Sequence, residues 1–477
     1  MISQLSLFEN SMEGSRNNTY KDNTYKEKFK FSILLSAVGD SLGWPLEFNK
    51  KKPLKKIETF IKWRKLSGGK WWGYIEEIAP GEYSDDTQLT LAVARAVRND
   101  GKFDPNYFSY LELPLWLDYE RGGGKSVKLA ARNLSKKKTL WFMNFYKTKE
   151  LSYFNAGANG AAMRNLPIAL VNMENEERFI LETIKNSLIT HGHPRALIGS
   201  LTIGAAQIYL LRNNLVANEL LSYINHILFE SDKVIKQPFD PDISNWLKET
   251  ENISNIKYYE SFKKYIKEAS DFLKEIPRFL NKEIENYYAL VKALEPSFKS
   301  SGISTTCAAI YIFLKHSDRP AKGLINAANF VGTDTDTIAS FVGSLIGAFL
   351  GASIDQKLLE LQEKIQDRNY LQNIAKKLWL IYKGKLKSSE SKRKLQKEEG
   401  YSTISKWKNR LKEIFNDNLK EGDEIIHPVL GRGTIEYKTR KKLDQKENYI
   451  VNIFKIKFDC GQTIYLHSRA NKITLEA

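Results

Sequence analysis

The stretch Gly332-Thr333-Asp334-Thr335-Asp336-Thr337, followed by the apolar residues 338–354, predicts a helix that begins at an acidic turn. Within the apolar part, Gly343, Gly347 and Gly351 recur at every fourth position. This spacing of small residues lets a neighbouring helix backbone approach closely and also occurs in membrane helices. Because the segment starts directly behind two aspartates and contains two serines, we expect a tightly packed core helix of a soluble protein.

A second acidic stretch, Ser84-Asp85-Asp86-Thr87, precedes the amphipathic pattern of residues 88–97. Serine and aspartate at a helix start accept hydrogen bonds from free N–H groups, so simple capping is one interpretation. Mg²⁺ and Mn²⁺ bind several oxygen ligands, including carboxylates, hydroxyls and water. Two clusters with two carboxylates and a hydroxyl each would suit a dinuclear site. Spacing alone leaves both interpretations open.

Two glycine-containing loops lie between the acidic clusters, Arg121-Gly122-Gly123-Gly124 and residues 157–164. The second loop, Gly-Ala-Asn-Gly-Ala-Ala-Met-Arg, would present backbone N–H groups at a helix start, which suits a phosphate. The order of its residues matches neither standard nucleotide-binding motif.

The motifs as a set resemble those of the ADP-ribosylglycohydrolase family, to which the dinitrogenase reductase-activating glycohydrolases belong. They are, in chain order, Gly39-Asp40-Ser41-Leu42-Gly43-Trp44-Pro45-Leu46-Glu47-Phe48, Ser84-Asp85-Asp86-Thr87, Gly160-Ala161-Ala162-Met163-Arg164, Thr190-His191 and Gly332-Thr333-Asp334-Thr335-Asp336-Thr337. The resemblance covers residues 28–355, and residues 213–300 match least well.

The resemblance implies a compact all-α fold around two Mg²⁺ or Mn²⁺ ions and cleavage of the bond between ADP-ribose and an acceptor. It assigns metal binding to Ser84, Asp85, Asp86, Asp334, Asp336 and Thr337. It assigns substrate binding to Gly122, Gly123, Gly124, Lys125, Gly157, Asn159, Gly160, Ala161, Met163 and His191. The catalytic residues implied are Glu47, Asp85, Asp86 and Asp336. Whether Glu47 or a metal-ligating aspartate is the base stays open, and His193 is expected to be structural.

Changes in composition predict the domains of this mainly helical chain. They are a mobile tail (1–27), the glycohydrolase-like domain (28–375, with a helical insertion at 213–300), a basic helical linker (376–420) and a small β-barrel module (421–477). The linker holds fourteen Lys and Arg against five Asp and Glu, within a net charge of +17 for the chain. A solvated helix and attraction to a polyanion such as nucleic acid both explain this charge.

Both ends of the chain resemble interaction elements. Short β-branched runs after residue 421 and the motif Gly422-Asp423-Glu424-Ile425-Ile426-His427-Pro428 resemble SH3/Tudor-like modules of bacterial repair helicases and transcription-coupling proteins. This resemblance implies contact with DNA or RNA polymerase through residues 376–477. The peptide Gln4-Leu5-Ser6-Leu7-Phe8 resembles those that dock on the replication sliding clamp.

Cysteine usage and the first residues indicate the compartment. Cys307 and Cys460 match no zinc or redox spacing, which excludes a disulfide framework and favours the bacterial cytoplasm. The first residues lack a signal-peptide pattern, and no membrane partner is expected. The predicted function is therefore a metal-dependent hydrolase that releases ADP-ribose from a protein, a nucleic acid or a small molecule. A non-catalytic recruitment protein that binds ADP-ribose is the alternative.

Overall fold

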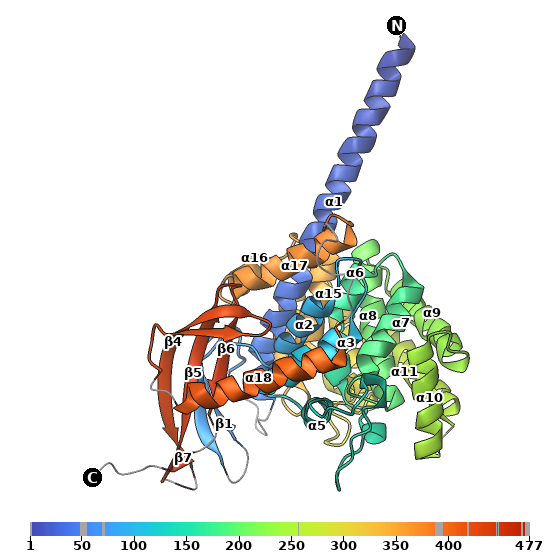
Figure 1. The fold of residues 1–477 in the computed structure, drawn as a ribbon. Coiled ribbons are helices and arrows are strands. Elements are labelled where there is room, and N and C mark those ends of the chain that lie inside the picture. Colours follow the sequence, from blue (N-terminus) through green and yellow to red (C-terminus); the bar gives the residue numbers. More distant parts are fainter. Residues whose placement is uncertain are drawn as a thin grey trace.

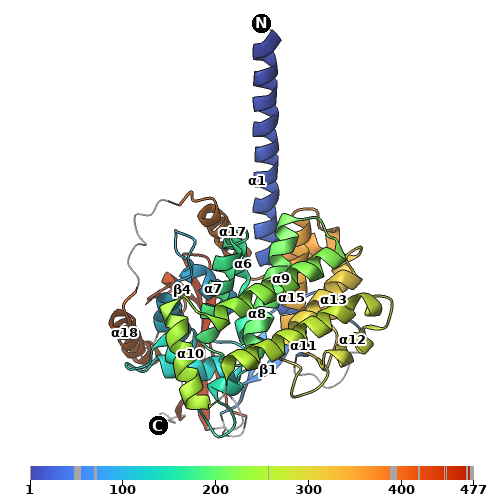
Figure 2. The ribbon, with the colours of Figure 1, turned by 90° about the vertical axis from the view of Figure 1, so that its right-hand side faces the viewer.

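The structure is a computed structural model that describes residues 2–47, 55–68, 72–255, 257–386, 395–416, 419–444, 446, 448–468 and 471–472. Side chains are described from residue 23 onward, without those of 416, 471 and 472. The described chain forms a helical body with a small β-region on one side (Figure 1). Helix α1 projects from the body at its N-terminal end in both ribbon views (Figures 1 and 2).

The centre of the helical body is the contact between α1 (Ile2–Gly43) and α15 (Thr335–Leu350). A Cβ atom added to Gly343 would lie 1.9 Å from the carbonyl oxygen of Leu35, and one added to Gly39 would lie 2.1 Å from that of Ala339. The two backbones therefore touch, and only glycine fits at these positions. This confirms the prediction of a tightly packed core helix.

The same helix contact brings together two chain segments that carry predicted site residues. Thr335 Oγ1 donates a hydrogen bond of 2.8 Å to the carbonyl oxygen of Gly43, just before the 3₁₀ turn η1 (Trp44–Leu46) and Glu47. The packing of α1 on α15 therefore fixes Glu47 beside the acidic turn.

Further helices surround this pair and share one continuous apolar core. They include α2 (Asp85–Ala96), α3 (Pro105–Tyr107), α4 (Leu113–Trp116), α5 (Lys125–Leu134), α6 (Leu166–Val171), α7 (Glu176–Leu188), α8 (Pro194–Arg212), α13 (Gly302–Lys315), α14 (Pro320–Ala328), α16 (Gln356–Glu363) and α17 (Arg368–Tyr382). Short turns of other helix types are η2 (Phe108–Glu112), η3 (Trp141–Met143), η4 (Tyr153–Asn155) and η5 (Asn159–Ala161).

Residues 213–300 form helices, as predicted, and these helices belong to the same core. They are α9 (Ala217–Lys236), α10 (Pro241–Ser254), α11 (Tyr258–Phe279) and α12 (Ile284–Leu290). Helices α9 and α11 pack on α8, and α11 also packs on α13. Trp246 and Phe262 are fully buried in this packing. The segment lies on the outer side of the body (Figure 2) without forming a separate core.

Residues 63–78 contain an antiparallel hairpin, which was not predicted from the sequence. Strand β1 (Trp63–Ser67) pairs with β2 (Tyr74–Ile78). Alternate side chains of β2 are buried and exposed, the period of a half-buried strand. The pattern Tyr74-Ile75-Glu76-Glu77-Ile78 escaped detection because its buried positions include Glu76, whose carboxylate is paired inside the protein.

The C-terminal residues form an antiparallel sheet, as the β-branched runs predicted. Its strands are β3 (Glu424–His427), β4 (Gly431–Lys442), β5 (Tyr449–Phe458), β6 (Thr463–His467) and β7 (Asn471–Lys472). The order is β3-β4-β5-β6, with β7 paired to β5. The pairings among the described strands give an open sheet, and closure into a barrel is not among them.

The predicted linker is not a free connection between two domains. Helix α17 belongs to the core, and α18 (Lys397–Asn416) lies along the body next to the sheet (Figure 1). Ile404, Trp407, Leu411 and Ile414 repeat every third or fourth residue and are buried. Trp407 Nε1 also donates a 3.1 Å hydrogen bond to Asp118. The high charge of this segment obscured its apolar face.

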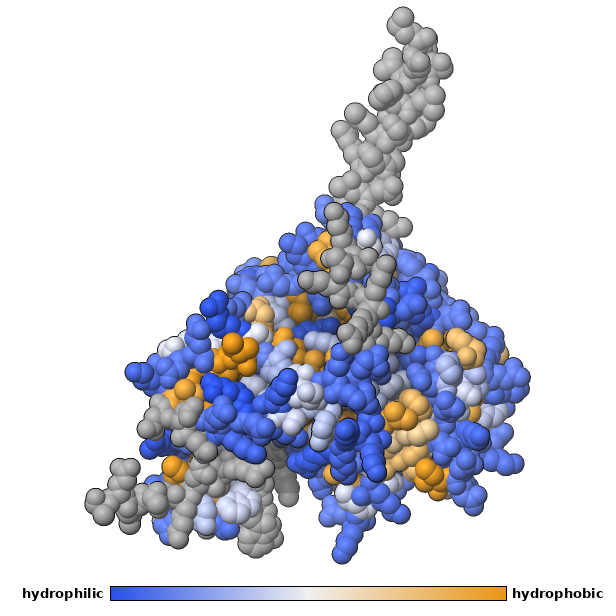
Figure 3. All heavy atoms as spheres, in the orientation of Figure 1, coloured by the Kyte–Doolittle hydropathy of each residue, from blue (hydrophilic) through white to orange (hydrophobic). Residues whose placement is uncertain are grey.

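Residues 2–27, most of the predicted mobile tail, are helical, because α1 begins at Ile2. The side chains of the predicted clamp-binding peptide, residues 4–8, lie outside the described residues. The face of the molecule drawn in Figure 3 is mostly hydrophilic, with hydrophobic residues in small groups. Among the described residues, no helix has both the length and the apolar character required to cross a membrane.

Candidate active site

Both acidic clusters and both glycine loops meet at one cavity of about 270 Å³, here called the acidic pocket. The predicted residues that line it are Glu47, Asp85, Asp86, Gly122, Gly124, Lys125, Asn159, Gly160, Met163, His191, Asp334, Asp336 and Thr337. Four predicted residues, Ser84, Gly123, Gly157 and Ala161, are not among its lining residues. The pocket thus joins chain segments that are up to about 290 residues apart.

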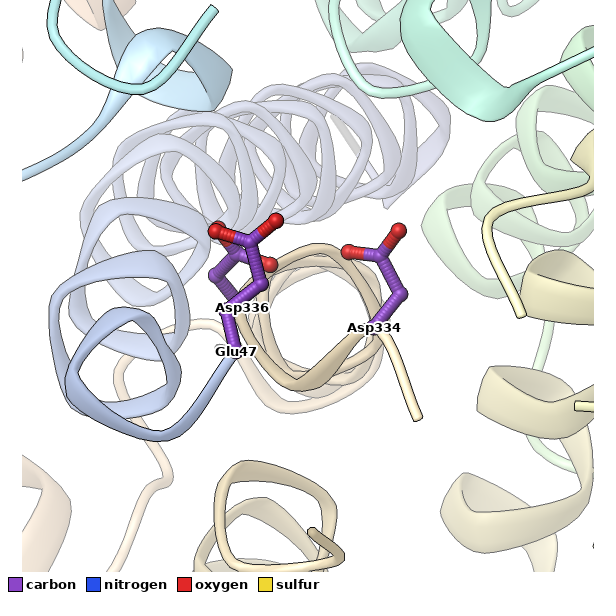
Figure 4. Close-up of side chains that lie close together, drawn as sticks. All are labelled: Glu47, Asp334 and Asp336. Atoms are coloured by element: carbon purple, nitrogen blue, oxygen red, sulfur yellow. The ribbon is translucent and has the colours of Figure 1, made fainter. Parts of the chain in front are cut away.

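Three carboxylates in the acidic pocket are close enough to share one cation. One oxygen each from Glu47, Asp334 and Asp336 lies within 4.8 Å of the other two. Figure 4 shows the three carboxyl groups pointing to the same side, with Glu47 following α1 and the two aspartates at the start of α15. Asp334 and Asp336, which alternate along this turn, therefore face the same side.

The second acidic cluster sits at the N-terminus of α2, where Asp40 orders it. Asp40 is fully buried and accepts hydrogen bonds from the backbone N–H of Ser84 (3.1 Å) and Thr87 (3.0 Å) and from the Thr87 hydroxyl (2.6 Å). The Ser84 hydroxyl accepts from the N–H of Asp86 at 3.3 Å. Asp40 is a positioning residue that sequence reasoning missed, although it stands in the quoted Gly39-Asp40-Ser41 motif.

The buried carboxylates have strongly shifted pKa values. Burial, and next the charge of Glu120, raise the pKa of Asp85 to about 8. Burial and the neighbouring carboxylates raise the pKa values of Glu47, Asp86 and Asp336 well above their usual range. So many carboxylates in one dry pocket repel each other unless protons or cations neutralise them.

The donor set of the acidic pocket fits divalent cations. Asp86 Oδ2 is buried and has no hydrogen-bond partner within the protein. A buried acceptor without a partner is costly, and a hard cation is a partner that a carboxylate oxygen accepts. The Ser84 hydroxyl, a predicted ligand, caps α2 and is fully buried.

The first glycine loop forms the wall of the acidic pocket opposite α15. Gly122 has a φ angle of +102°, which side-chain-bearing residues rarely adopt, and a Cβ there would lie 3.1 Å from Asp85 Oδ1. Gln88 on α2 holds the loop, because its Oε1 accepts from the N–H of Arg121 at 3.2 Å. Gly123 lines a neighbouring cavity instead.

The second loop supplies Asn159, Gly160 and Met163 to the pocket. Asn159 Nδ2 donates a hydrogen bond of 3.2 Å to Asp334 Oδ2, so this predicted substrate-binding residue also orients an acidic residue. The other two predicted residues of the loop, Gly157 and Ala161, are not among the lining residues of the pocket. Gly157 lies against the His193 ring, and Ala161 is fully buried.

His191 presents a hydrogen-bond donor to the acidic pocket. Arg164 donates to Thr190 Oγ1 at 2.9 Å, which leaves the Thr190 hydroxyl proton for His191 Nδ1, 2.7 Å away. This favours the tautomer with the proton on Nε2, and Nε2 is buried without a protein partner. Burial lowers the pKa of His191 to about 3, so the ring is neutral at pH 7.

His193 caps a helix, as expected from its place on a turn. Its Nδ1 accepts a hydrogen bond of 3.2 Å from the N–H of Arg195 at the start of α8. The structural interpretation of this histidine is therefore confirmed.

Comparison with known proteins gives several similar sequences. The chain is 30% identical over 168 residues to an ADP-ribosyl-[dinitrogen reductase] glycohydrolase of Rhodospirillum rubrum, covering 35% of this chain and 52% of that protein. It is 22% identical to the ADP-ribosylarginine hydrolase Tri1 of Serratia proteamaculans, covering 39% and 48%. The chain thus spans about half the length of these two relatives. An uncharacterized protein of Archaeoglobus fulgidus is 24% identical, over 75% of this chain and 97% of that protein.

Among solved structures, an ADP-ribosylglycohydrolase-related protein complex is 18% identical and matches with a TM-score of 0.49 over 76% of this chain and all of that chain. A sequence profile described as ADP-ribosylglycohydrolase matches residues 21–387, which include the whole acidic pocket. On this match the chain belongs to the ADP-ribosylglycohydrolase family of hydrolases.

Proposed function

We propose that this chain hydrolyses the glycosidic bond between ADP-ribose and an acceptor, with two Mg²⁺ or Mn²⁺ ions in the acidic pocket. The observation that carries the proposal is the convergence of Glu47, Asp334 and Asp336 within 4.8 Å, beside Asp86 with its unpartnered oxygen. The proposed ligands are Ser84, Asp85, Asp86, Asp334, Asp336 and Thr337, and the Ser84 hydroxyl also accepts a hydrogen bond from the N–H of Asp86. Bound cations would supply positive charge and Lewis acidity at the ribose.

The side chains around the cluster bind and orient the substrate in this proposal. The backbone lines the acidic pocket at the glycine loop 122–124 and at Gly160, and backbone N–H groups there would suit a diphosphate. His191 Nε2–H is a neutral donor for a ribose hydroxyl or a phosphate oxygen. Lys125 and Met163 complete the wall.

Glu47 is the proposed acid–base residue. It lines both the acidic pocket and the neighbouring cavity, unlike the four aspartates. A carboxylate at this boundary stands next to the bond between ribose and acceptor, where cleavage develops oxocarbenium character. Glu47 would stabilise that charge or move a proton between water and the leaving acceptor.

The domain division and the cellular setting are also proposals. We assign an N-terminal tail to residues 1–27, the catalytic domain to residues 28–375 and an appended region to residues 376–477. The appended region consists of the basic linker (376–420) and the small interaction module (421–477). We place the protein in the bacterial cytoplasm in a DNA-associated setting. The basic charge of the appended region supports attraction to a polyanion. Contact with RNA polymerase or the sliding clamp stays a prediction from short sequence resemblances.

A release assay tests the proposed activity. We expect the purified chain to free ADP-ribose from at least one class of ADP-ribosylated substrate (protein, nucleic acid or small molecule) when Mg²⁺ or Mn²⁺ is present. EDTA should abolish the release. Tight calorimetric binding of ADP-ribose with no release from any class would instead establish the non-catalytic recruitment protein.

A further inference from the structure

A second cavity of about 580 Å³ adjoins the acidic pocket. The two cavities share Glu47, Gly122, Gly124 and Lys125. This second cavity is here called the outer cavity. If ADP-ribose occupies the acidic pocket, the outer cavity offers space, next to Glu47, for the group attached to its ribose. The residues of the outer cavity therefore bear on the choice of acceptor.

The wall of the outer cavity includes a residue from outside the matched family region. Strand β1 contributes Trp63 and Lys65, and β6 contributes His467. The family profile ends at residue 387, so His467 belongs to the appended region. The C-terminal sheet is thus part of the surroundings of the proposed active site.

Buried polar contacts hold His467 to the rest of the site. Its Nδ1 is hydrogen-bonded to the Tyr74 hydroxyl, and its Nε2 lies 3.7 Å from Glu76 Oε1. Glu76 pairs with Arg121 at 2.9 Å, and Arg121 also pairs with Glu82 at 2.8 Å. Since Arg121 directly precedes Gly122, the sheet, the hairpin and the glycine loop are linked.

Strand β6 makes a second contact with Arg121 through Tyr465, two residues before His467. The guanidinium of Arg121 stacks 4.0 Å from the centre of the Tyr465 ring, whose hydroxyl is hydrogen-bonded to Glu82. All of Arg121, Glu76 and Tyr465 are buried. Removal of the sheet would take the Tyr465 hydrogen bond from Glu82 and the Tyr465 ring from Arg121, and would uncover this buried charged network.

A third cavity of about 570 Å³ adjoins the outer cavity, and Glu47 is not among its lining residues. It shares Gly68, Tyr74, Glu120 and His467 with the outer cavity. Its remaining wall is largely apolar and aromatic and includes Trp72, Leu411, Phe415 and Val451. Planar groups pack well against such a wall.

The charge of the outer cavity is mainly positive. Arg64, Lys65, Lys125 and Lys128 line it, against Glu47 and Glu120. Glu120 is already engaged by Lys128 at 3.2 Å and by the N–H of Gly123 at 2.9 Å. Among the described lining residues, cations therefore outnumber carboxylates by four to two, although Lys125 also pairs with Glu150 at 3.3 Å and Arg64 lies 3.9 Å from Glu77. This excess of positive charge disfavours a cationic acceptor such as an arginine side chain. A phosphate-bearing acceptor finds complementary charge.

We propose that the outer cavity is the acceptor subsite, that the C-terminal sheet completes it through His467, and that its acceptor is a nucleotide unit of a nucleic acid. The base would lie against the aromatic side chains of Tyr74 and Trp72, and the flanking phosphates would lie near Arg64 and Lys65. This inference rests on the proposed function, because it requires ADP-ribose in the acidic pocket.

The test compares kcat/KM for an ADP-ribosylated DNA oligonucleotide and for ADP-ribosylarginine, using the full chain with Mg²⁺. We expect the oligonucleotide to be preferred. Arg64→Ala and His467→Ala should lower kcat/KM for the oligonucleotide by about 10-fold, mainly through KM, and change the ratio of the two substrates accordingly. Lys274→Met, on an exposed lysine of α11, is the matched control for lost positive charge and should leave the ratio unchanged.

Preference for ADP-ribosylarginine, or equal losses for both substrates in Arg64→Ala and His467→Ala, would overturn the inference. Because Arg64 is exposed, its replacement keeps the assay interpretable if His467→Ala folds poorly. Binding of unmodified single-stranded oligonucleotide, followed by fluorescence anisotropy, separates the two proposals. If the wild-type chain does not bind the oligonucleotide, the acceptor subsite is overturned. If the chain binds it, Arg64→Ala weakens the binding and no substrate releases ADP-ribose, only the proposed activity is overturned.

Discussion

The helix pair α1–α15 and the C-terminal sheet reach the same cavities in different ways. The helix pair uses backbone contact at Gly39 and Gly343, and it places Glu47 beside Asp334 and Asp336. The sheet uses buried side chains, chiefly Tyr465 and His467, which contact Glu82, Glu76 and Tyr74. The first contact lies within the matched family region and the second lies outside it. In the two proposals above, the hydrolytic chemistry and part of the acceptor subsite therefore belong to separate parts of the chain.

The largest effect is expected at the helix pair. Gly343→Ala would place a methyl group 1.9 Å from the Leu35 carbonyl oxygen, so the helices must separate. We expect a loss of about 3 kcal/mol or more in the free energy of unfolding, and loss of activity with it. Chemical denaturation measures the change. Ala352→Leu, at an exposed position just after α15, is the control and should cost less than about 0.5 kcal/mol.

Trp407→Ala tests whether the appended region unfolds together with the helical body or as an independent domain. Trp407 is buried and donates to Asp118, so its truncation should cost about 3 kcal/mol. If α18 and the sheet belong to one cooperative unit, calorimetry shows a single transition at lower temperature. An early, separate transition with the main one unchanged would mean that the two regions fold independently.

The pH dependence of stability tests the buried carboxylates of the acidic pocket. Since burial raises the folded-state pKa of Asp85 to about 8, its protonated form favours folding. This contribution to the free energy of unfolding is fully present below about pH 4, the pKa of an aspartate in the unfolded chain. It is lost as the pH rises through about 8. Without divalent cations, we therefore expect the melting temperature to fall by several degrees over this range. Millimolar Mg²⁺ should reverse the fall.

Asp85→Asn provides the control for that profile, because it removes one titrating group from the pocket. Its cation-free melting temperature should vary less with pH than that of the wild type. A wild-type profile that rises with pH in the absence of cations would contradict the assignment of these carboxylates to a charge-crowded pocket.

The smallest effect is expected at the far end of the sheet. Arg432 is exposed and pairs with Asp459 at 3.0 Å. A surface ion pair contributes about 0–1 kcal/mol, so Arg432→Ala should leave both stability and the substrate ratio almost unchanged. A large change in the ratio would move the acceptor-binding surface from the outer cavity to the outer strands, and equilibrium unfolding together with the release assay decides this.

The helices and most of the pocket could be predicted from the sequence because their signals are local. Glycine spacing identified α15, and the two acidic turns each begin a helix where free N–H groups favour carboxylates. That the two turns meet followed only from the resemblance to a family. Asp40 escaped because its role depends on Ser84 and Thr87, more than 40 residues away.

The integration of the appended region was not predictable from local patterns. The charged residues of α18 indicated a linker, whereas its four buried apolar side chains pack on the body. Likewise, Glu76, Arg121 and Tyr465 are far apart in sequence, and their pairing exists only in the folded chain. Buried ionic networks leave no periodic signal in a sequence, unlike helices and strands.

The most direct test of the central claim is ADP-ribose release by Asp336→Asn and Asp86→Asn, measured with Mg²⁺ or Mn²⁺ on a substrate that the wild type cleaves. Both side chains lie in the acidic pocket and keep their size in these variants. Loss of a charged group at the reacting centre should reduce kcat/KM by about 1,000-fold or more. Lys274→Met should retain wild-type release. Full activity of both aspartate variants, or release by the wild type that EDTA leaves unchanged, would contradict a cation-dependent glycohydrolase centred on this pocket.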